Sequence, residues 1–154
     1  MSIKRILAAA GCAVAAMVGL APAATAQVEA APNCQYGNTY GTRVTSAAVG
    51  GMGAIQLCRD SSYRYWGFLL LTRSPSSGQH GQGYLERYRD GKWESYVTCD
   101  SSGGNGKVLP GQTRCWTPKF TGASGHYTFR AWGAVFDNPH PHDPVASGYT
   151  GLTR

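Results

Sequence analysis

The residues that could do chemistry fall into a few small groups. Ser101 and Ser102 are potential nucleophiles, but a serine nucleophile needs a histidine base that a third group holds in place. No histidine motif of that kind accompanies them, so we interpret both as loop serines. His140 and His142 have an H-x-H spacing that could offer two imidazoles to a metal. Prolines interleave them and no further ligand cluster follows, so we expect a solvated loop, no metal site and no cofactor.

A third group consists of Glu94, Arg114 and His126. The segments WESYVT (93–98) and GHYTF (125–129) resemble those that carry the glutamate and the histidine of small secreted microbial ribonucleases. In that family a glutamate is the general base, arginines bind the phosphate and a histidine is the general acid, in this chain order. The family's N-terminal helix and arginine cluster have no counterpart in this sequence. The alternative is that Glu94 pairs with Arg87 and that His126 is an exposed strand residue.

The N-terminal segment has the features of a targeting signal. Two basic residues precede an apolar run and the small-residue exit ATA (24–26). This order is typical of a secretory signal peptide, so we expect residues 1–26 to be removed and the protein to be secreted and extracellular, with no membrane contact after cleavage. A retained anchor, for which the apolar run is short, and lipidation at Cys12 are the alternatives.

The rest of the chain has the size and composition of one small β domain. It is rich in Gly, Tyr, Trp and Thr and poor in Glu and Lys, as secreted β proteins are. Loss of the signal peptide lowers the formal net charge from +6 to +4. The basic residues are scattered, so the charge does not call for a nucleic-acid partner. We expect residues 27–41 to form an extended leader and residues 42–154 a single domain.

Four cysteines remain after cleavage: Cys34, Cys58, Cys99 and Cys115. An even number in an exported chain predicts two disulfides with three possible connectivities, and the absence of a C-x-x-C pair argues against zinc. Pairing of neighbours closes the two shortest loops, so we favour Cys34–Cys58 and Cys99–Cys115. Each would contribute about 3 kcal/mol in the chain-entropy model.

The pattern of apolar residues places the main strands. Residues 54–59 predict one strand, 60–62 a turn, and 63–72 a second strand that is apolar on both faces between Tyr65 and Leu71 and therefore covered on both sides. The Gly/Ser-rich stretch 74–83 predicts a loop. In the strand that follows residue 126, Phe129, Ala131 and Val135 alternate with the oppositely directed Arg130 and Trp132. The Pro-rich tail after it ends in a possible edge strand.

Asp90-Gly91 is the strongest hairpin signal, because both central residues of a type I′ turn need positive φ. A two-residue loop also sets the register of the two strands. The expected pairs are Arg89 with Lys92, Tyr88 with Trp93, Arg87 with Glu94, Leu85 with Tyr96, and Tyr84 with Val97. One face of the hairpin then carries a cross-strand cluster of Tyr84, Tyr88, Trp93 and Val97, which is mainly aromatic.

Two resemblances bear on fold and family. ASGHYTF (123–129) resembles the tyrosine-corner stretch of immunoglobulin-like domains, with Phe129 in place of that family's cysteine. It implies an immunoglobulin-like or related β-sandwich. GAIQLCRDSSYRYWG (53–67) is similar to small exported actinobacterial proteins. Among these, the chain resembles the adaptor subunit of umbrella toxin particles, whose extended N-terminus, here Val28–Tyr40, grips a partner.

These observations favour a secreted, non-enzymatic module that binds other secreted proteins, as an adaptor in an extracellular antibacterial toxin particle. Exposed aromatic residues flanked by arginine mark interfaces. The residues we expect to bind are Val28, Tyr36, Tyr40, Arg87, Tyr88, Arg89 and Trp93. The alternatives are a ribonuclease that uses Glu94, Arg114 and His126, and a protease inhibitor, for which the loop 74–83 is too flexible.

Overall fold

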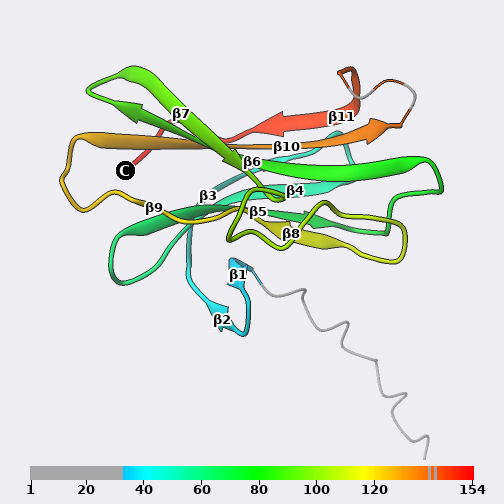
Figure 1. Ribbon diagram of the computed structural model, residues 1–154, viewed down its shortest axis with the longest axis horizontal. Coiled ribbons are helices and arrows are strands. Elements are labelled where there is room, and N and C mark those ends of the chain that lie inside the picture. The colour runs from blue at the N-terminus through cyan, green and yellow to red at the C-terminus, as the bar shows by residue number, and fades with distance from the viewer. Residues whose placement is uncertain (1–32, 139, 141) are drawn as a thin grey trace, which may run out of the picture.

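A computed structural model describes residues 33–138, 140 and 142–154. Every helix or strand assigned in this part of the chain is a β-strand, and two antiparallel sheets face each other as a sandwich (Figure 1). The all-β sandwich with two disulfides that the sequence predicts is therefore confirmed. The predicted signal peptide (1–26) and Val28 lie outside the described residues. Within the described ranges, no helix has the length and apolar character needed to cross a membrane.

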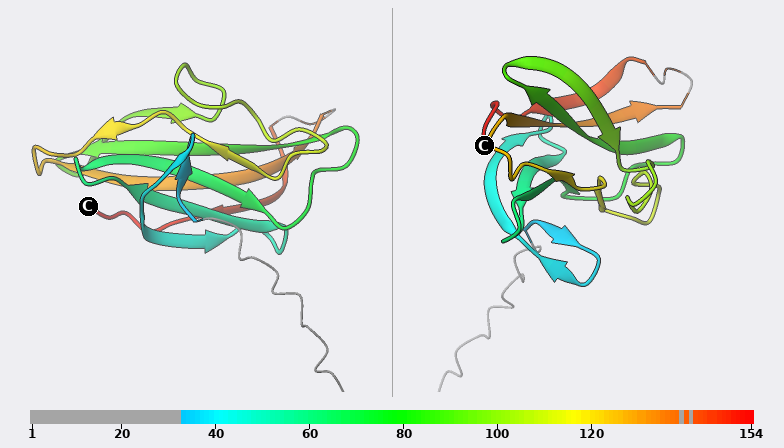
Figure 2. Two further views of the ribbon diagram at one scale, coloured as in Figure 1. Left: turned by 90° about the horizontal axis from the view of Figure 1, so that it is seen from below. Right: turned by 60° about the vertical axis from the view of Figure 1, so that its left-hand side comes forward.

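The strands are distributed over three sheets. The four-stranded sheet contains, in spatial order, β11 (Pro144–Tyr149), β10 (Tyr127–Asp137), β6 (Gln79–Arg89) and β7 (Lys92–Thr98). The five-stranded sheet contains β3 (Thr42–Ala48), β4 (Gly53–Arg59), β5 (Arg64–Leu71) and β8 (Arg114–Trp116), with β9 (Phe120–Thr121) paired to the start of β5. The short hairpin of β1 (Gln35–Tyr36) and β2 (Thr39–Tyr40) lies outside the five-stranded sheet (Figure 2).

The predicted central strand pair is confirmed as β4 and β5, and β5 is covered on both faces. Its inward residues join the main core between the two sheets, which includes Ile55, Leu57, Leu69, Leu85, Phe129 and Val135. Its outward residues Trp66 and Phe68 are also buried, in a second and smaller core with Cys34 and Cys58. The strand is apolar on both faces because each face packs into a different core.

The N-terminal region differs from the predicted extended leader at 27–41. From residue 33 onward the chain forms the β1–β2 hairpin, and the Cys34–Cys58 disulfide ties it to β4. The hairpin lies over the outward face of β5, where the backbone C=O of Gln35 accepts a hydrogen bond from Trp66 Nε1 at 3.1 Å. The leader prediction is wrong for this part because the disulfide holds the segment against the apolar outward face of β5, where it packs as a hairpin.

The predicted loop at 74–83 ends earlier than expected, since β6 already begins at Gln79. Of the glycines in this stretch, Gly78 lies in the turn before β6 at a φ of 85°, whereas Gly81 and Gly83 lie within β6 where the layers approach closely. A Cβ atom at Gly83 would stand 3.0 Å from Cys99 Sγ, so a larger residue would have to displace the disulfide by a few tenths of an ångström. The possible edge strand in the tail is confirmed as β11, which pairs with β10.

The hairpin of β6 and β7 has the predicted turn but a different register. Asp90 and Gly91 have φ angles of 49° and 79°, as a type I′ turn requires. The first two pairs agree with the prediction. Beyond them a β-bulge shifts the register by one residue, and the pairs are Arg87 with Ser95, Leu85 with Val97, and Tyr84 with Thr98. The prediction failed at this point because a bulge adds one unpaired residue that the turn does not signal.

Candidate functional site

The outward face of the four-stranded sheet carries a continuous group of aromatic side chains. Strand alternation turns Phe129, Ala131 and Val135 of β10 into the core, and it turns Trp132 outward. The register then places Trp132 opposite Tyr149 on one side and Tyr84 on the other. The bulge in β7 puts Tyr96 on this same face, where the simple register would have turned it inward.

Four rings therefore form a row that crosses all four strands, and we call Tyr149, Trp132, Tyr84 and Tyr96 the aromatic row. The ring centroids of Trp132 and Tyr149 are 5.4 Å apart with planes at 7°, and those of Tyr84 and Trp132 are 4.2 Å apart at 28°. Tyr84 and Tyr96 are 6.1 Å apart at 44°. The first two pairs are stacked face to face, so the rings of Tyr149, Trp132 and Tyr84 stand upright on the sheet, whereas the ring of Tyr96 is tilted against Tyr84. Their faces contact each other and their edges point to solvent.

The row is exposed at its ends and desolvated at its centre. Tyr96 and Tyr149 are 56% and 50% exposed, whereas Tyr84 and Trp132 are half-buried. Burial, followed by the nearby charge of Asp100, raises the pKa of Tyr84. The Nε1 atom of Trp132 is buried and has no hydrogen-bond partner among the described residues. Such a centre has already lost most of its water, which lowers the cost of covering it with a partner.

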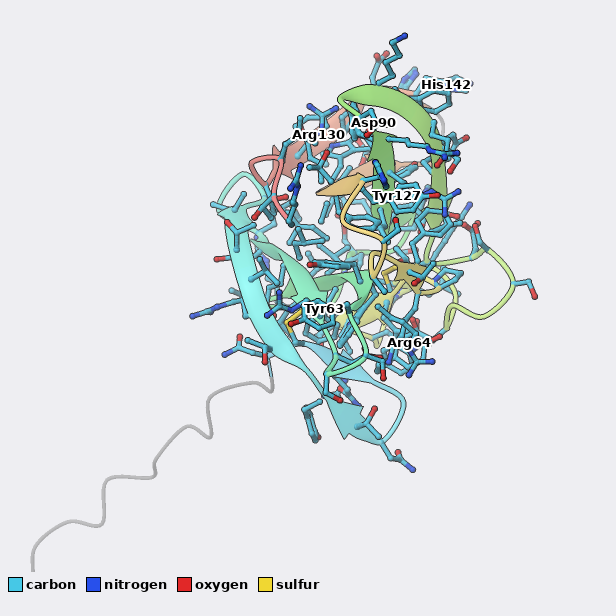
Figure 3. All side chains as sticks on the ribbon, turned by 90° about the vertical axis from the view of Figure 1, so that its left-hand side faces the viewer. Tyr63, Arg64, Asp90, Tyr127, Arg130 and His142 are labelled. Carbon is cyan, nitrogen blue, oxygen red and sulfur yellow. A yellow bond between two sulfur atoms is a disulfide. The ribbon has the colours of Figure 1, made fainter. Side chains whose placement is uncertain are left out.

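A charged group borders the row on the side of the β6–β7 turn. Arg130 Nη2 lies 2.7 Å from Glu86 Oε2, and the Tyr88 hydroxyl donates to the same carboxylate oxygen at 3.0 Å. The Arg130 guanidinium carbon lies 4.9 Å from the ring centre of Tyr149, within the range of a cation–π contact. Burial and the Glu86 carboxylate raise the pKa of Tyr88. Figure 3 shows this end of the sandwich, with Arg130 and Asp90 both in its upper layer.

The predicted hairpin residues do not all lie on one surface. Tyr88 and Trp93 are cross-strand partners, and Trp93, which is 57% exposed, lies on β7 closer to the turn than Tyr96 of the row. Arg89 is exposed next to the turn. Arg87 is turned away from this surface, because its guanidinium carbon lies 4.4 Å from the ring centre of Phe120 and its Nε lies 2.6 Å from Glu94. Arg87 thus holds the hairpin onto the layer below.

The predicted N-terminal binding residues also separate. The ring centre of Tyr36 lies 5.7 Å from that of Trp66 and 6.0 Å from that of Trp116, and its hydroxyl donates to the Gly103 carbonyl at 2.9 Å. Tyr36 is therefore a packing residue of the second core. Tyr40, which is 62% exposed, is available at the surface of the hairpin.

The residues of the ribonuclease hypothesis are not brought together. His126 lies beside the β6–β7 turn, with Nδ1 2.9 Å from Asp90 Oδ1, and Glu94 pairs with Arg87 as the alternative interpretation expected. Arg114 belongs to the other sheet and pairs with Leu70, near the far end of β5. Six residues of strand, or roughly 20 Å, separate that position from the start of β5 at the His126 end. Among the described residues no cluster of His, Cys, Asp and Glu fits a metal ion.

The central residues of the aromatic row were not among the predicted site residues. The sequence carried one usable signal, since Trp132 stands on the otherwise polar face of the alternating strand at 127–135. An aromatic residue on that face is either covered or available for binding. Tyr84 and Tyr149 could not be joined to it without knowing that β6 and β11 flank β10.

The comparisons with known proteins found one partial sequence match. No protein-family model matches the chain, and no solved structure matches it. An uncharacterized protein of Bacillus subtilis (strain 168), YjfA, is 34% identical to it over 68 residues. That match covers 44% of this chain, which spans only 41% of the length of YjfA. This similarity does not assign the chain to a family.

Proposed function

We propose that the protein is a secreted module that binds another protein through the aromatic row, and that it works without catalysis. The observation that carries the proposal is the stack of Tyr149, Trp132, Tyr84 and Tyr96, bordered by Arg130. Tyr, Trp and Arg supply most of the binding energy at protein interfaces, above all around a desolvated centre. Two disulfides in a small β protein are compatible with an extracellular location.

The orientation of the rings supports a protein as the partner. A sugar ring or a nucleobase binds to an aromatic residue by stacking on an open ring face, and the faces of the two central rings are already stacked on their neighbours. What remains for a partner are ring edges and the hydroxyls of the exposed tyrosines at the two ends of the row. Irregular protein side chains can pack between such edges and accept these hydrogen bonds.

In its specific form the proposal makes the partner another exported protein, with this chain as an adaptor in an extracellular antibacterial toxin particle. Support for the adaptor comes from the resemblance of residues 28–40, which the structure describes from residue 33. In that segment Tyr40 is exposed and Tyr36 is engaged in packing. An adaptor needs two separate contact surfaces, and Tyr40 lies on the layer opposite to the aromatic row.

The proposal is tested by purification of the tagged protein from the culture supernatant of its producer, with quantification of co-purified proteins. The tagged variants are Tyr96→Ser in the row, Tyr40→Ser on the hairpin and Tyr63→Ser as a control of similar exposure, 53%, on the β4–β5 turn. We expect Tyr96→Ser to weaken recovery of one exported partner at least 10-fold and Tyr63→Ser to leave it unchanged. Recovery of a monomer alone, or equal loss in all variants, would overturn the proposal.

A further inference from the structure

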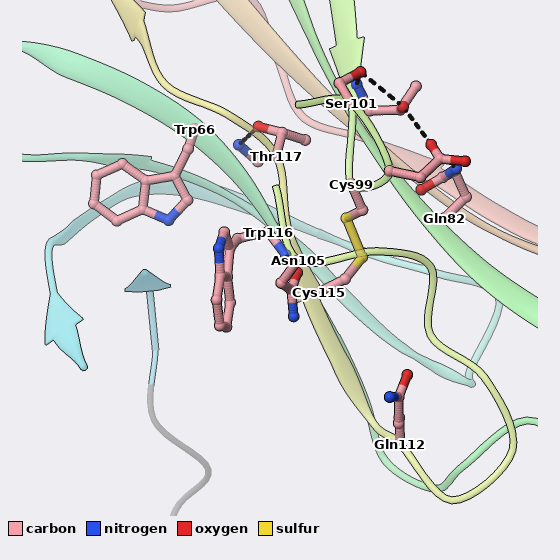
Figure 4. Close-up of a disulfide and its surroundings, with 12 residues drawn as sticks. Trp66, Gln82, Cys99, Ser101, Asn105, Gln112, Cys115, Trp116 and Thr117 are labelled. Carbon is pink, nitrogen blue, oxygen red and sulfur yellow. Dashed lines mark hydrogen bonds between the residues drawn. A yellow bond between two sulfur atoms is a disulfide. The ribbon is translucent and has the colours of Figure 1, made fainter. Parts of the chain in front are cut away.

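A polar pocket lies on the opposite layer from the aromatic row, where β8 meets the N-terminal hairpin. Its volume is about 380 Å³, at the low end of the roughly 300–1,000 Å³ of small-molecule sites. The side chains that give it chemical character are Gln35, Asn105, Gln112, Arg114 and Trp116. Arg114 and Trp116 are two residues apart on one strand and so point to the same side, and Figure 4 shows Asn105 next to Trp116.

The amide groups around the pocket are fixed in known orientations. Asn105 Oδ1 accepts from the Trp116 backbone N–H at 2.7 Å, and Gln112 Oε1 accepts from that of Leu109 at 3.1 Å. Both amides therefore have their NH₂ groups left to donate. Gln35 is held in the opposite sense, since its Nε2 donates to the Gly37 carbonyl at 2.8 Å. Its Oε1 is buried and has no hydrogen-bond partner among the described residues, so it lacks a donor.

The only charged side chain among the described residues that line the pocket is the positive Arg114. Arg114 is exposed, and its guanidinium has no ion-pair partner within the part of the chain that the structure describes. None of the pocket-lining residues is acidic. A guanidinium with five free donors is suited to bidentate binding of a carboxylate. Trp116 is half-buried against Tyr36 and offers the rest of its indole surface to the pocket.

We propose that this pocket binds a carboxylated sugar, a uronic acid unit at the end of or within a short saccharide. Arg114 binds the carboxylate, and the amide donors of Asn105 and Gln112 bind ring hydroxyl oxygens. Trp116 packs against the C–H face of the ring. A single cation matches the single charge of a uronic acid, whereas a nucleotide phosphate draws on several cationic or backbone donors.

The test is titration of the full mature protein with digalacturonic acid, followed by ¹⁵N–¹H NMR of the side-chain amide and indole resonances. We expect saturable shifts at Asn105, Gln112 and the Trp116 indole. Arg114→Gln should weaken the affinity about 10-fold to 100-fold, which corresponds to a charge-assisted pair. Arg89→Gln removes an exposed guanidinium elsewhere and should leave the affinity unchanged. A backbone spectrum of each variant shows that it is folded.

Two comparison ligands make the outcome decisive. Galactobiose lacks the carboxylate and should bind at least 10-fold more weakly, and adenosine monophosphate should not compete. The proposal is overturned if the neutral sugar binds as tightly as the acidic one, if Arg114→Gln has no effect, or if the nucleotide displaces the saccharide. The pocket and the aromatic row are tested by different variants, so failure of one proposal leaves the other standing.

Discussion

The two outer faces of the sandwich carry similar aromatic side chains in very different surroundings. On the five-stranded sheet, Trp66 and Phe68 are 1% and 0% exposed beneath the disulfide-anchored hairpin. On the four-stranded sheet, Trp132 and Tyr84 are half-buried, and the ends of their row are open to solvent. The same residue types thus form a core on one face and a surface on the other.

The difference lies in what covers each face, and this is a matter of chain connectivity. Cys34 joins the hairpin to Cys58, which is the cross-strand partner of Trp66. The disulfide therefore holds the hairpin over the outer face of the five-stranded sheet. In the described residues no equivalent segment covers the other layer, and there the rings cover one another by stacking. Cross-strand aromatic pairs stabilise a sheet by about 0.5–1.5 kcal/mol beyond the contribution of their buried area. Stacking therefore offsets part of the cost of leaving these aromatic residues uncovered by another segment.

Replacement of one tryptophan on each face gives the largest contrast. Trp66→Ala empties a fully buried site and should lower the free energy of unfolding by about 3–5 kcal/mol. Trp132→Ala removes a ring that is already partly wet, and the loss should be roughly half as large. Urea unfolding followed by far-UV circular dichroism measures both. Equal losses would show that the aromatic row is a core and not a surface.

Removal of the hairpin disulfide should lower the free energy of unfolding nearly as much as Trp66→Ala does. The double variant Cys34→Ser/Cys58→Ser opens a loop with a sequence separation of 24 and should cost about 3 kcal/mol. It should also make Trp66 accessible to iodide quenching of fluorescence, since the hairpin is then free to leave. Cys99→Ser/Cys115→Ser is the control, which destabilises the chain but leaves Trp66 covered. Unchanged quenching in the first variant would mean that the hairpin stays without its disulfide.

A smaller effect is expected from the charges beside the covered face. Lys119 Nζ lies 4.3 Å and 4.6 Å from the ring centres of Tyr36 and Trp66, and it binds Asp60 at 3.0 Å. Burial would raise the pKa of Asp60, but hydrogen bonds from the Arg64 backbone N–H and from Lys119 outweigh it and hold the pKa below its ordinary value. Asp60 therefore stabilises the fold above the unfolded-state pKa of about 3.9, and this contribution is lost as the pH falls through the lower folded-state value.

Asp60→Asn should accordingly cost about 1–2 kcal/mol at pH 7 and clearly less at pH 2.5. Urea titrations at the two pH values measure the difference. Asp143→Asn, at an exposed position, serves as the control. A cost that does not change with pH would show that Asp60 acts through shape and not through charge.

The smallest predicted effect concerns the stack itself. A double-mutant cycle of Trp132→Leu with Tyr149→Leu should give a coupling energy of about 0.5–1.5 kcal/mol, because these rings are stacked. The same cycle with Tyr40→Leu in place of Tyr149→Leu should give a coupling near zero. A negligible value for the stacked pair would mean that ring stacking does not account for the stability of the open face.

Some of the fold was readable from local sequence. The doubly apolar run at 65–71 predicted the central strand, Asp90-Gly91 predicted the turn, and the short cysteine loops predicted both disulfides. In each case the cause lies within a few residues or in a loop-closure entropy that favours near neighbours. The register beyond Tyr88 could not be predicted, since the turn does not signal the extra residue that a bulge inserts.

By itself, then, the sequence determined a β protein with two disulfides, a central strand and a surplus of aromatic residues. The tertiary structure alone decided which aromatic residues are buried and which are presented. Burial depends on the order of strands in each sheet and on the segment that a distant cysteine holds in place. Tyr84, Trp132 and Tyr149 are neighbours only because β6 and β11 flank β10, and no local pattern in the chain encodes that order.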